Sequence, residues 1–318
     1  MSNKNDNLHE LAQQFKIAQG LPTHEHIRIL QKLEKVKREK LILILNYFMT
    51  LETNPEVLSY IIKLASRFRN DLTMDILIDL FLSKNISKND EKYIQLKITI
   101  ANALGNSKNN DAVLPLLYVL NSKDEHYKVR LACAEALGKI GSSYAVTPLI
   151  NLVSDDEEKS MYLRESAAKA LGMLGDMRAV DPLVNILENK NGLFDKFTFL
   201  KERIIETLGR LGSNGDERSL KALKNALEDD ASYIRCGAVE ALVEIDDDRV
   251  IPLIENMLED KDEEVARTAI FALYELLGCS YIKSLLTSTH LQECCKDEIQ
   301  NIIKEEEAEL LDSAGENE

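Results

Sequence analysis

Five polar side chains recur at one position of a repeated sequence and could bind the main chain of another protein. Asparagine is unfavourable inside a helix, because its amide competes with backbone hydrogen bonds. Three of the five side chains are asparagines in successive repeats, and such a row of amides could instead bind an extended peptide. The alternatives are that the amides bond to one another or to the adjacent helix and fix repeat stacking, or that they only reflect repeat duplication. Each side chain lies two residues after a leucine: Tyr118, Asn151, Asn185, Asn225 and Glu255.

Two further features could contact a partner. Asp181 is expected on the same helical face as the amides, where it could meet a basic group of a ligand. The segment 189–199 lengthens one repeat and contains Phe194 and Phe197. Exposed aromatic side chains can anchor an interface. The alternative is that these rings cover the gap that the insertion opens.

A basic residue stands early in the first half of five repeats. Such a row could bind phosphate groups, but acidic residues crowd the preceding turns, for example in the stretch 155–158. We therefore expect the basic residues to form ion pairs and hydrogen bonds between repeats. They are Lys97, Arg130, Arg164, Lys201 and Arg235.

No residue pattern indicates catalysis. The chain has no phosphate-binding Gly-rich loop, no nucleophile elbow and no H-E-x-x-H motif. Cys279, His290, Cys294 and Cys295 form only a loose group. Adjacent residues on a helix point about 100° apart, which does not suit the paired ligands of a zinc site. We expect no enzyme activity, no metal and no cofactor.

The elements that position these residues are repeated helix pairs. An Ala-Leu-Gly-like element recurs at intervals of 33, 34, 37, 34 and 31 residues, at Leu104, Leu137, Leu171, Leu208, Leu242 and Leu273. Apolar residues around it follow a helical period, and small residues beside it allow a second helix to approach closely. Glycines after it suit left-handed helix ends: Gly141, Gly175 and Gly212. A second helix then begins with Ala-Val-x-Pro-Leu, where proline is tolerated.

One such helix pair cannot bury its own apolar face, so neighbouring pairs must stack. The sequence therefore predicts an all-α protein, an α-solenoid of about six repeats with degenerate helical caps. The pattern resembles the HEAT repeat, in the short bacterial form of phycobilin (phycobilisome) lyases, over residues 92–288. The resemblance implies that the second helices line a concave groove. It implies little about function, because this repeat serves many unrelated roles.

The flanking regions are less regular. Residues 1–90 are expected to form an N-terminal helical region of cap repeats, with helices at 25–51, 55–68 and 72–84. Asn54 and Asn70 supply start signals for the last two. Residues 91–290 form the solenoid. Residues 291–318 form a C-terminal helix and a tail that holds only acidic charges after Lys304.

Charge narrows the range of partners. The net charge is −15, and the acidic excess lies after residue 90. An acidic body repels phosphate backbones, so we expect no nucleic-acid partner. That also argues against DNA repair, which a resemblance to HEAT-like alkylpurine glycosylases would imply. No segment has the roughly 20 apolar residues of a membrane span, and we expect a cytoplasmic protein without membrane insertion.

The favoured function is a non-catalytic scaffold or adaptor that binds a protein or extended peptide in the concave groove. The acidic charge of the chain favours a partner with a basic segment. The residues expected to contact it are the five polar positions together with Asp181, Phe194 and Phe197. The alternative, implied by the resemblance, is a bilin lyase or chromophore chaperone. The absence of tryptophan weighs against a site that packs a tetrapyrrole.

Overall fold

The computed structural model consists of helices throughout the part of the chain that it describes, and this confirms the predicted all-α fold. The chain divides into two compact units, Met1–Leu149 and Ile150–Glu318. The structure describes residues 13, 15–17, 22–33, 38–68, 70–83, 90–155, 157–188, 198–213, 216–245, 247–287 and 291–315.

Among the described residues of the first unit, 13 and 15–17 are helical, and four longer helices precede the first two helix pairs. Asn54 and Asn70 cap their helices as predicted, each side chain accepting a hydrogen bond from a backbone N–H of the first turn. Two helices cover the range predicted as 25–51, and residues 34–37 lie outside the described residues. The elements are α2 (Thr23–Leu33), α3 (Arg38–Leu51), α4 (Pro55–Ala65), α5 (Asp71–Leu82), α6 (Glu91–Ser107), η1 (Asn110–Ala112), α7 (Val113–Asn121), α8 (Tyr127–Ile140) and η2 (Ser143–Ala145).

The second unit continues the repeat. Its elements are α9 (Val146–Ser154, which begins in the first unit), α10 (Met161–Leu174), η3 (Met177–Ala179), α11 (Val180–Glu188), α12 (Thr198–Gly212), α13 (Glu217–Ala226), α14 (Ser232–Val243), η5 (Asp248–Val250), α15 (Ile251–Asn256), η6 (Met257–Glu259), α16 (Glu263–Leu277), α17 (Cys279–Leu285) and α18 (Glu293–Gly315).

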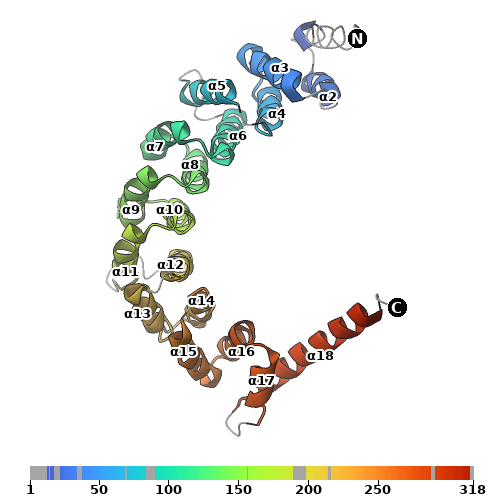
Figure 1. Ribbon diagram of the computed structural model, residues 1–318. Coiled ribbons are helices and arrows are strands. Elements are labelled where there is room, and N and C mark those ends of the chain that lie inside the picture. The colour runs from blue at the N-terminus through green and yellow to red at the C-terminus, as the bar shows by residue number, and fades with distance from the viewer. Residues whose placement is uncertain are drawn as a thin grey trace. The chain divides into compact units, whose positions relative to one another are not determined.

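Helices α10, α12, α14 and α16 pack side by side as one layer of the second unit, and α11, α13 and α15 form the other (Figure 1). We call these the first-helix layer and the second-helix layer.

The core is built from the predicted apolar positions. Leu104, Leu137, Leu208, Leu242 and Leu273 are fully buried, and Leu171 is nearly so. The Ala-Val-x-Pro-Leu element forms a short 3-10 turn that leads into the second helix, as in η2 and α9. The helix pairs are therefore those that the periodicity predicts.

The helix ends follow the glycine prediction in two of three places. Gly141 and Gly175 have φ of 80° and 66°, which is the left-handed conformation expected at a helix C-terminus. The prediction for Gly212 is wrong, because this residue still belongs to α12. A Cβ there would lie 3.1 Å from the Ser219 side chain, so Gly212 serves close packing instead.

Small residues hold the first-helix layer together tightly. A Cβ added to Gly209 of α12 would lie 2.6 Å from the backbone oxygen of Ala241 in α14. Contact between two helices at backbone distance is possible only where one of them lacks a side chain. The first helices can therefore approach each other very closely.

Replacing Gly209 with alanine is expected to destabilise the protein by about 1–3 kcal/mol, because the added methyl group overpacks the α12–α14 contact. Urea unfolding followed by circular dichroism measures this. Gly237→Ala is the matched control, since its Cβ would meet nothing nearer than 4.0 Å. It should be neutral or stabilising by up to about 1 kcal/mol, the helix propensity gain. Equal effects of the two substitutions would contradict the packing argument.

Candidate functional site

The three asparagines of the predicted row lie exposed on second helices. Asn151 is on α9, Asn185 on α11 and Asn225 on α13. Among the described residues, none forms a hydrogen bond with these amides. The structure therefore gives no support to the alternative in which the amides bond to one another or to the adjacent helix.

The second helices do not line the concave side of the second unit. Within this unit the first-helix layer lies on the inside of the curve and the second-helix layer on the outside (Figure 1). In a curved stack of two helix layers, the layer whose helices are more closely spaced lies on the inside of the curve. Gly209 allows this close spacing between the first helices. The expectation that Asn185 and Asn225 face a concave groove is therefore wrong for this unit.

The other predicted contact residues have varied surroundings. Tyr118 on α7 of the first unit is 70% exposed. Asp181 forms an ion pair with Arg218 of the next repeat, so a group of the chain itself neutralises it. Glu255 accepts a hydrogen bond from the hydroxyl of Tyr281 and raises the pKa of that tyrosine to about 12. Phe194 and Phe197 lie outside the described residues.

The basic series forms contacts between helices, as the structural alternative predicts. Arg130 Nε donates to the Leu120 carbonyl over 2.7 Å, and Arg164 Nη2 donates to the Val153 carbonyl over 2.6 Å. Arg235 is bidentate to Asp260. Lys97 forms a buried ion pair with Glu125, and Lys201 Nζ lies 3.9 Å from an oxygen of Asp229. The hypothesis that these basic residues form a row that binds phosphate groups is therefore wrong.

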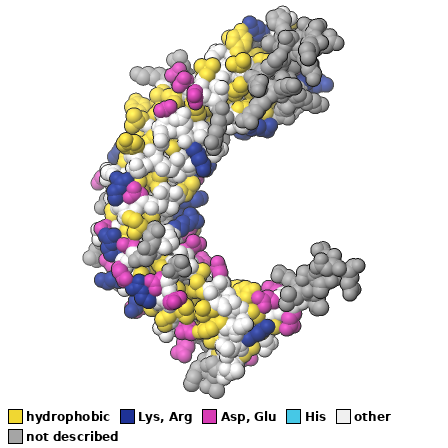
Figure 2. All heavy atoms as spheres, in the orientation of Figure 1, with side chains coloured by type: hydrophobic (Ala, Val, Ile, Leu, Met, Phe, Trp, Pro, Cys, Tyr) yellow, Lys and Arg dark blue, Asp and Glu magenta, His cyan; other side chains and the backbone are white. Residues whose placement is uncertain are grey.

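A hollow of about 650 Å³ opens on the first-helix layer of the second unit. Residues from α10, α12, α14 and α16 line it, and acidic side chains reach the inner edge of this layer (Figure 2). We call it the acidic hollow. Its charged residues are Glu165, Glu202, Arg203, Glu206, Arg210, Glu240, Glu244 and Glu264.

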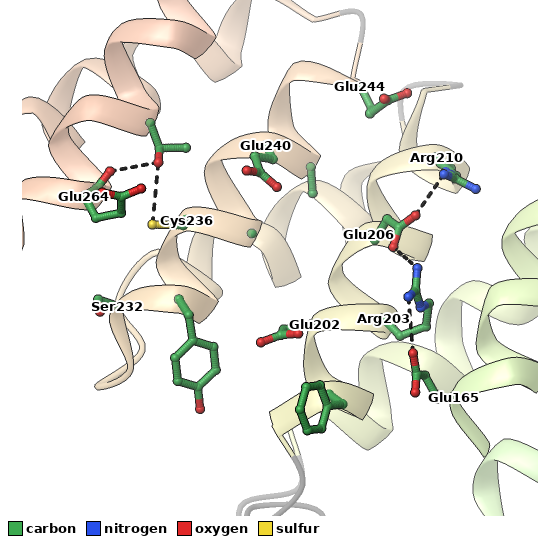
Figure 3. Close-up of a pocket in the computed structure, with 15 residues that line it drawn as sticks. Glu165, Glu202, Arg203, Glu206, Arg210, Ser232, Cys236, Glu240, Glu244 and Glu264 are labelled. Atoms are coloured by element: carbon green, nitrogen blue, oxygen red, sulfur yellow. Dashed lines mark hydrogen bonds and ion pairs between the residues drawn. The ribbon is translucent and has the colours of Figure 1, made fainter. Parts of the chain in front are cut away.

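Half of the hollow is neutralised by its own ion pairs. Arg203 Nη2 lies 3.2 Å from Glu165 Oε1, and Arg203 also contacts Glu206 on its own helix. Arg210 Nη2 lies 2.8 Å from Glu206 Oε1. Figure 3 shows these residues as one chain of contacts between α10 and α12. Glu165 and Glu206 are thus already paired.

Four carboxylates of the hollow have no cationic partner among the described residues. Glu202 comes from α12, Glu240 and Glu244 from α14 and the turn after it, and Glu264 from α16 (Figure 3). Burial and the nearby Glu165 raise the pKa of Glu202, although Arg203 opposes this. The potential in this part of the hollow is therefore negative and favours a cation.

Aromatic side chains border the same hollow. Phe199 at the start of α12 is 68% exposed, and Tyr233 at the start of α14 is 44% exposed. An aromatic face can hold the alkyl stem or the charge of a lysine or arginine. Cys236 also lines the hollow, where Thr268 Oγ1 donates to its sulfur over 3.6 Å. Burial raises the pKa of the Cys236 thiol, so it is not an activated nucleophile.

The repeat contained a signal for these aromatic residues that our interpretation of the second helices missed. Phe199 and Tyr233 stand nine residues before Leu208 and Leu242, and Tyr162 stands nine before Leu171. Exposed aromatics at one position of consecutive repeats mark a surface rather than a core. Tyr162 is 66% exposed, in agreement with that.

The described residues contain neither a metal-binding cluster nor a membrane-spanning helix. No group of three or more His, Cys, Asp or Glu side chains there is arranged to hold a metal ion, and His290 lies outside them. None of the described helices combines the length and apolar character needed to cross a membrane.

Comparison with known proteins identifies the repeat. The HEAT-repeat sequence profile matches residues 84–161, 123–196 and 193–274, and no match was found among curated proteins. The complex of CpcE and CpcF of phycocyanin lyase from Nostoc sp. PCC7120 is 21% identical, with a TM-score of 0.44, over 73% of this chain and 93% of that chain. Escherichia coli YibA is 19% identical, with a TM-score of 0.50, over 86% and 97%.

The karyopherin Kap121p, bound to the extreme C-terminus of the protein phosphatase Cdc14p, is 12% identical, with a TM-score of 0.54. The match covers 91% of this chain and 37% of the karyopherin. At such identities these likenesses show the fold alone.

Proposed function

Because the chain belongs to the HEAT-repeat family, with matches across residues 84–274, we propose that it is a non-catalytic scaffold that binds a basic segment of a partner protein in the acidic hollow. The observation that carries this proposal is the set of four unpaired carboxylates at the hollow: Glu202, Glu240, Glu244 and Glu264.

The physical argument is one of charge and shape. Unpaired carboxylates in a concave surface attract cations, since the surrounding protein focuses their field. Phe199 and Tyr233 add apolar faces on which the stems of lysine or arginine can lie. Arginine, with its planar guanidinium, suits both the carboxylates and the rings. An extended segment that presents basic side chains would satisfy the site.

A direct binding measurement tests the proposal. A fluorescent nine-residue peptide with three arginines among alanines is titrated with the full chain and compared with the same peptide carrying glutamates. The basic peptide should bind at least about tenfold more tightly, because the potentials are complementary. Its affinity should fall as salt is added, because exposed charges are screened. Equal binding of the two peptides would overturn the proposal.

The alternative of a bilin lyase or chromophore chaperone gains no support from this site. A negative hollow repels the acidic side chains of a bilin, and the Cys236 thiol has a raised pKa. An absorbance shift on mixing the protein with free bilin would favour this alternative over the scaffold.

A further inference from the structure

We infer that Arg203 occupies the cation site between Glu165 and Glu206 in one half of the acidic hollow and thereby directs most basic residues of a bound segment to the α14–α16 half. This inference rests on the function proposed above and identifies the residue that sets where, along the hollow, the partner's charges bind.

The two halves of the hollow carry different charge. The α10–α12 half contains Glu165, Glu202 and Glu206 together with Arg203 and Arg210. The α14–α16 half contains acidic residues and no basic ones among those that line the hollow: Glu240, Glu244 and Glu264. The net formal charge is therefore −1 in the first half and −3 in the second.

Arg203 is placed as a bound arginine would be. Its guanidinium reaches Glu165 on the neighbouring helix at 3.2 Å and contacts Glu206 on its own helix. It is three-quarters buried, as is Glu165. Its Nε is buried without a hydrogen-bond partner among the described residues.

Two consequences follow for a bound segment. A cation of the partner can approach Glu165 and Glu206 only by displacing Arg203, and the positive charges of Arg203 and Arg210 repel it on the way. The carboxylates of Glu240, Glu244 and Glu264 have no such competitor. The partner's basic residues are therefore concentrated over α14 and α16, and over α12 only Glu202 is left to attract one.

The test uses Arg203→Gln and two nine-residue peptides, one with three arginines clustered at one end and one with five arginines along its length. The unmodified protein should bind both with affinities within about threefold, because three of the four unpaired carboxylates lie in the α14–α16 half. Arg203→Gln should leave the clustered peptide within about threefold but bind the evenly basic peptide about tenfold more tightly, since Glu165 becomes free and Glu206 keeps only Arg210 as its partner. Its affinity should also fall more steeply with salt.

The matched control is Arg218→Gln. Arg218 also contacts two acidic residues, Asp181 and Asp216, but lies on α13 in the second-helix layer. Arg218→Gln changes the net charge by the same amount as Arg203→Gln and should leave the affinities for both peptides unchanged. If Arg203→Gln and Arg218→Gln behave alike while the unmodified protein binds the peptides, the inference is overturned and the proposed function stands. If the unmodified protein binds neither peptide, the proposed function itself fails.

Discussion

Replacing Glu240 and Glu264 with lysine is expected to lower the affinity for the peptide with three arginines among alanines by at least about 100-fold, because two attractive contacts become repulsive ones. Both carboxylates are exposed in the acidic hollow and have no cationic partner among the described residues. Their loss should therefore cost little folding stability. Fluorescence anisotropy at low salt measures the affinity, and circular dichroism confirms that the variant is folded.

The control for this double substitution is Glu188→Lys with Glu259→Lys. These glutamates are also exposed, at the end of α11 and in η6, and neither lines the hollow. The change in net charge is the same, so a smaller effect isolates position from overall charge. The hollow variant should in turn gain affinity for the glutamate peptide. Equal losses in both double variants would show that binding follows net charge alone.

The fold could be predicted from sequence because its determinants are local and repeated. The helical period fixes which residues face the core, and all six leucines of the repeated element are buried. The left-handed ends at Gly141 and Gly175 follow from the lack of a Cβ. Gly212 shows the limit of this reasoning, because a glycine can also serve close packing.

The site was harder to predict because it depends on curvature. Which layer faces inward is decided by how closely the helices of each layer pack, a comparison between repeats that no single motif contains. The close contact of Gly209 with Ala241 places the first helices inside. The row through Asn185 therefore lies on the outer layer, and that its amides bind a protein segment stays a prediction. The hollow combines residues of four helices, and only their packing brings those residues together.

Removing the Asp260 carboxylate by Asp260→Ala is expected to destabilise the protein by about 3–5 kcal/mol, because it leaves the charge of Arg235 buried without its partner. Arg235 Nε and Nη2 donate to Asp260 over 2.8 and 2.7 Å, and the two side chains are 4% and 7% exposed. The pair joins α14 to the start of the next repeat. Urea unfolding measures the change, and Arg235→Met with Asp260→Leu should recover at least half of it, because a buried pair can be replaced by apolar residues.

The same pair makes an acid-dependent contribution to stability. Burial raises the pKa of Asp260, but hydrogen bonds from Arg235 and the Asp262 N–H outweigh it and hold the pKa below the ordinary value. A depressed pKa in the folded state adds stability that is complete above the unfolded pKa of about 4 and is lost as the pH falls below it. The stability difference between the unmodified protein and Asp260→Asn should therefore shrink between about pH 5 and pH 2.

Arg249→Ala, which removes the exposed Arg249–Asp247 pair, should leave the unfolding midpoint unchanged at neutral pH. A loss equal to that of Asp260→Ala would contradict a special role for the buried pair.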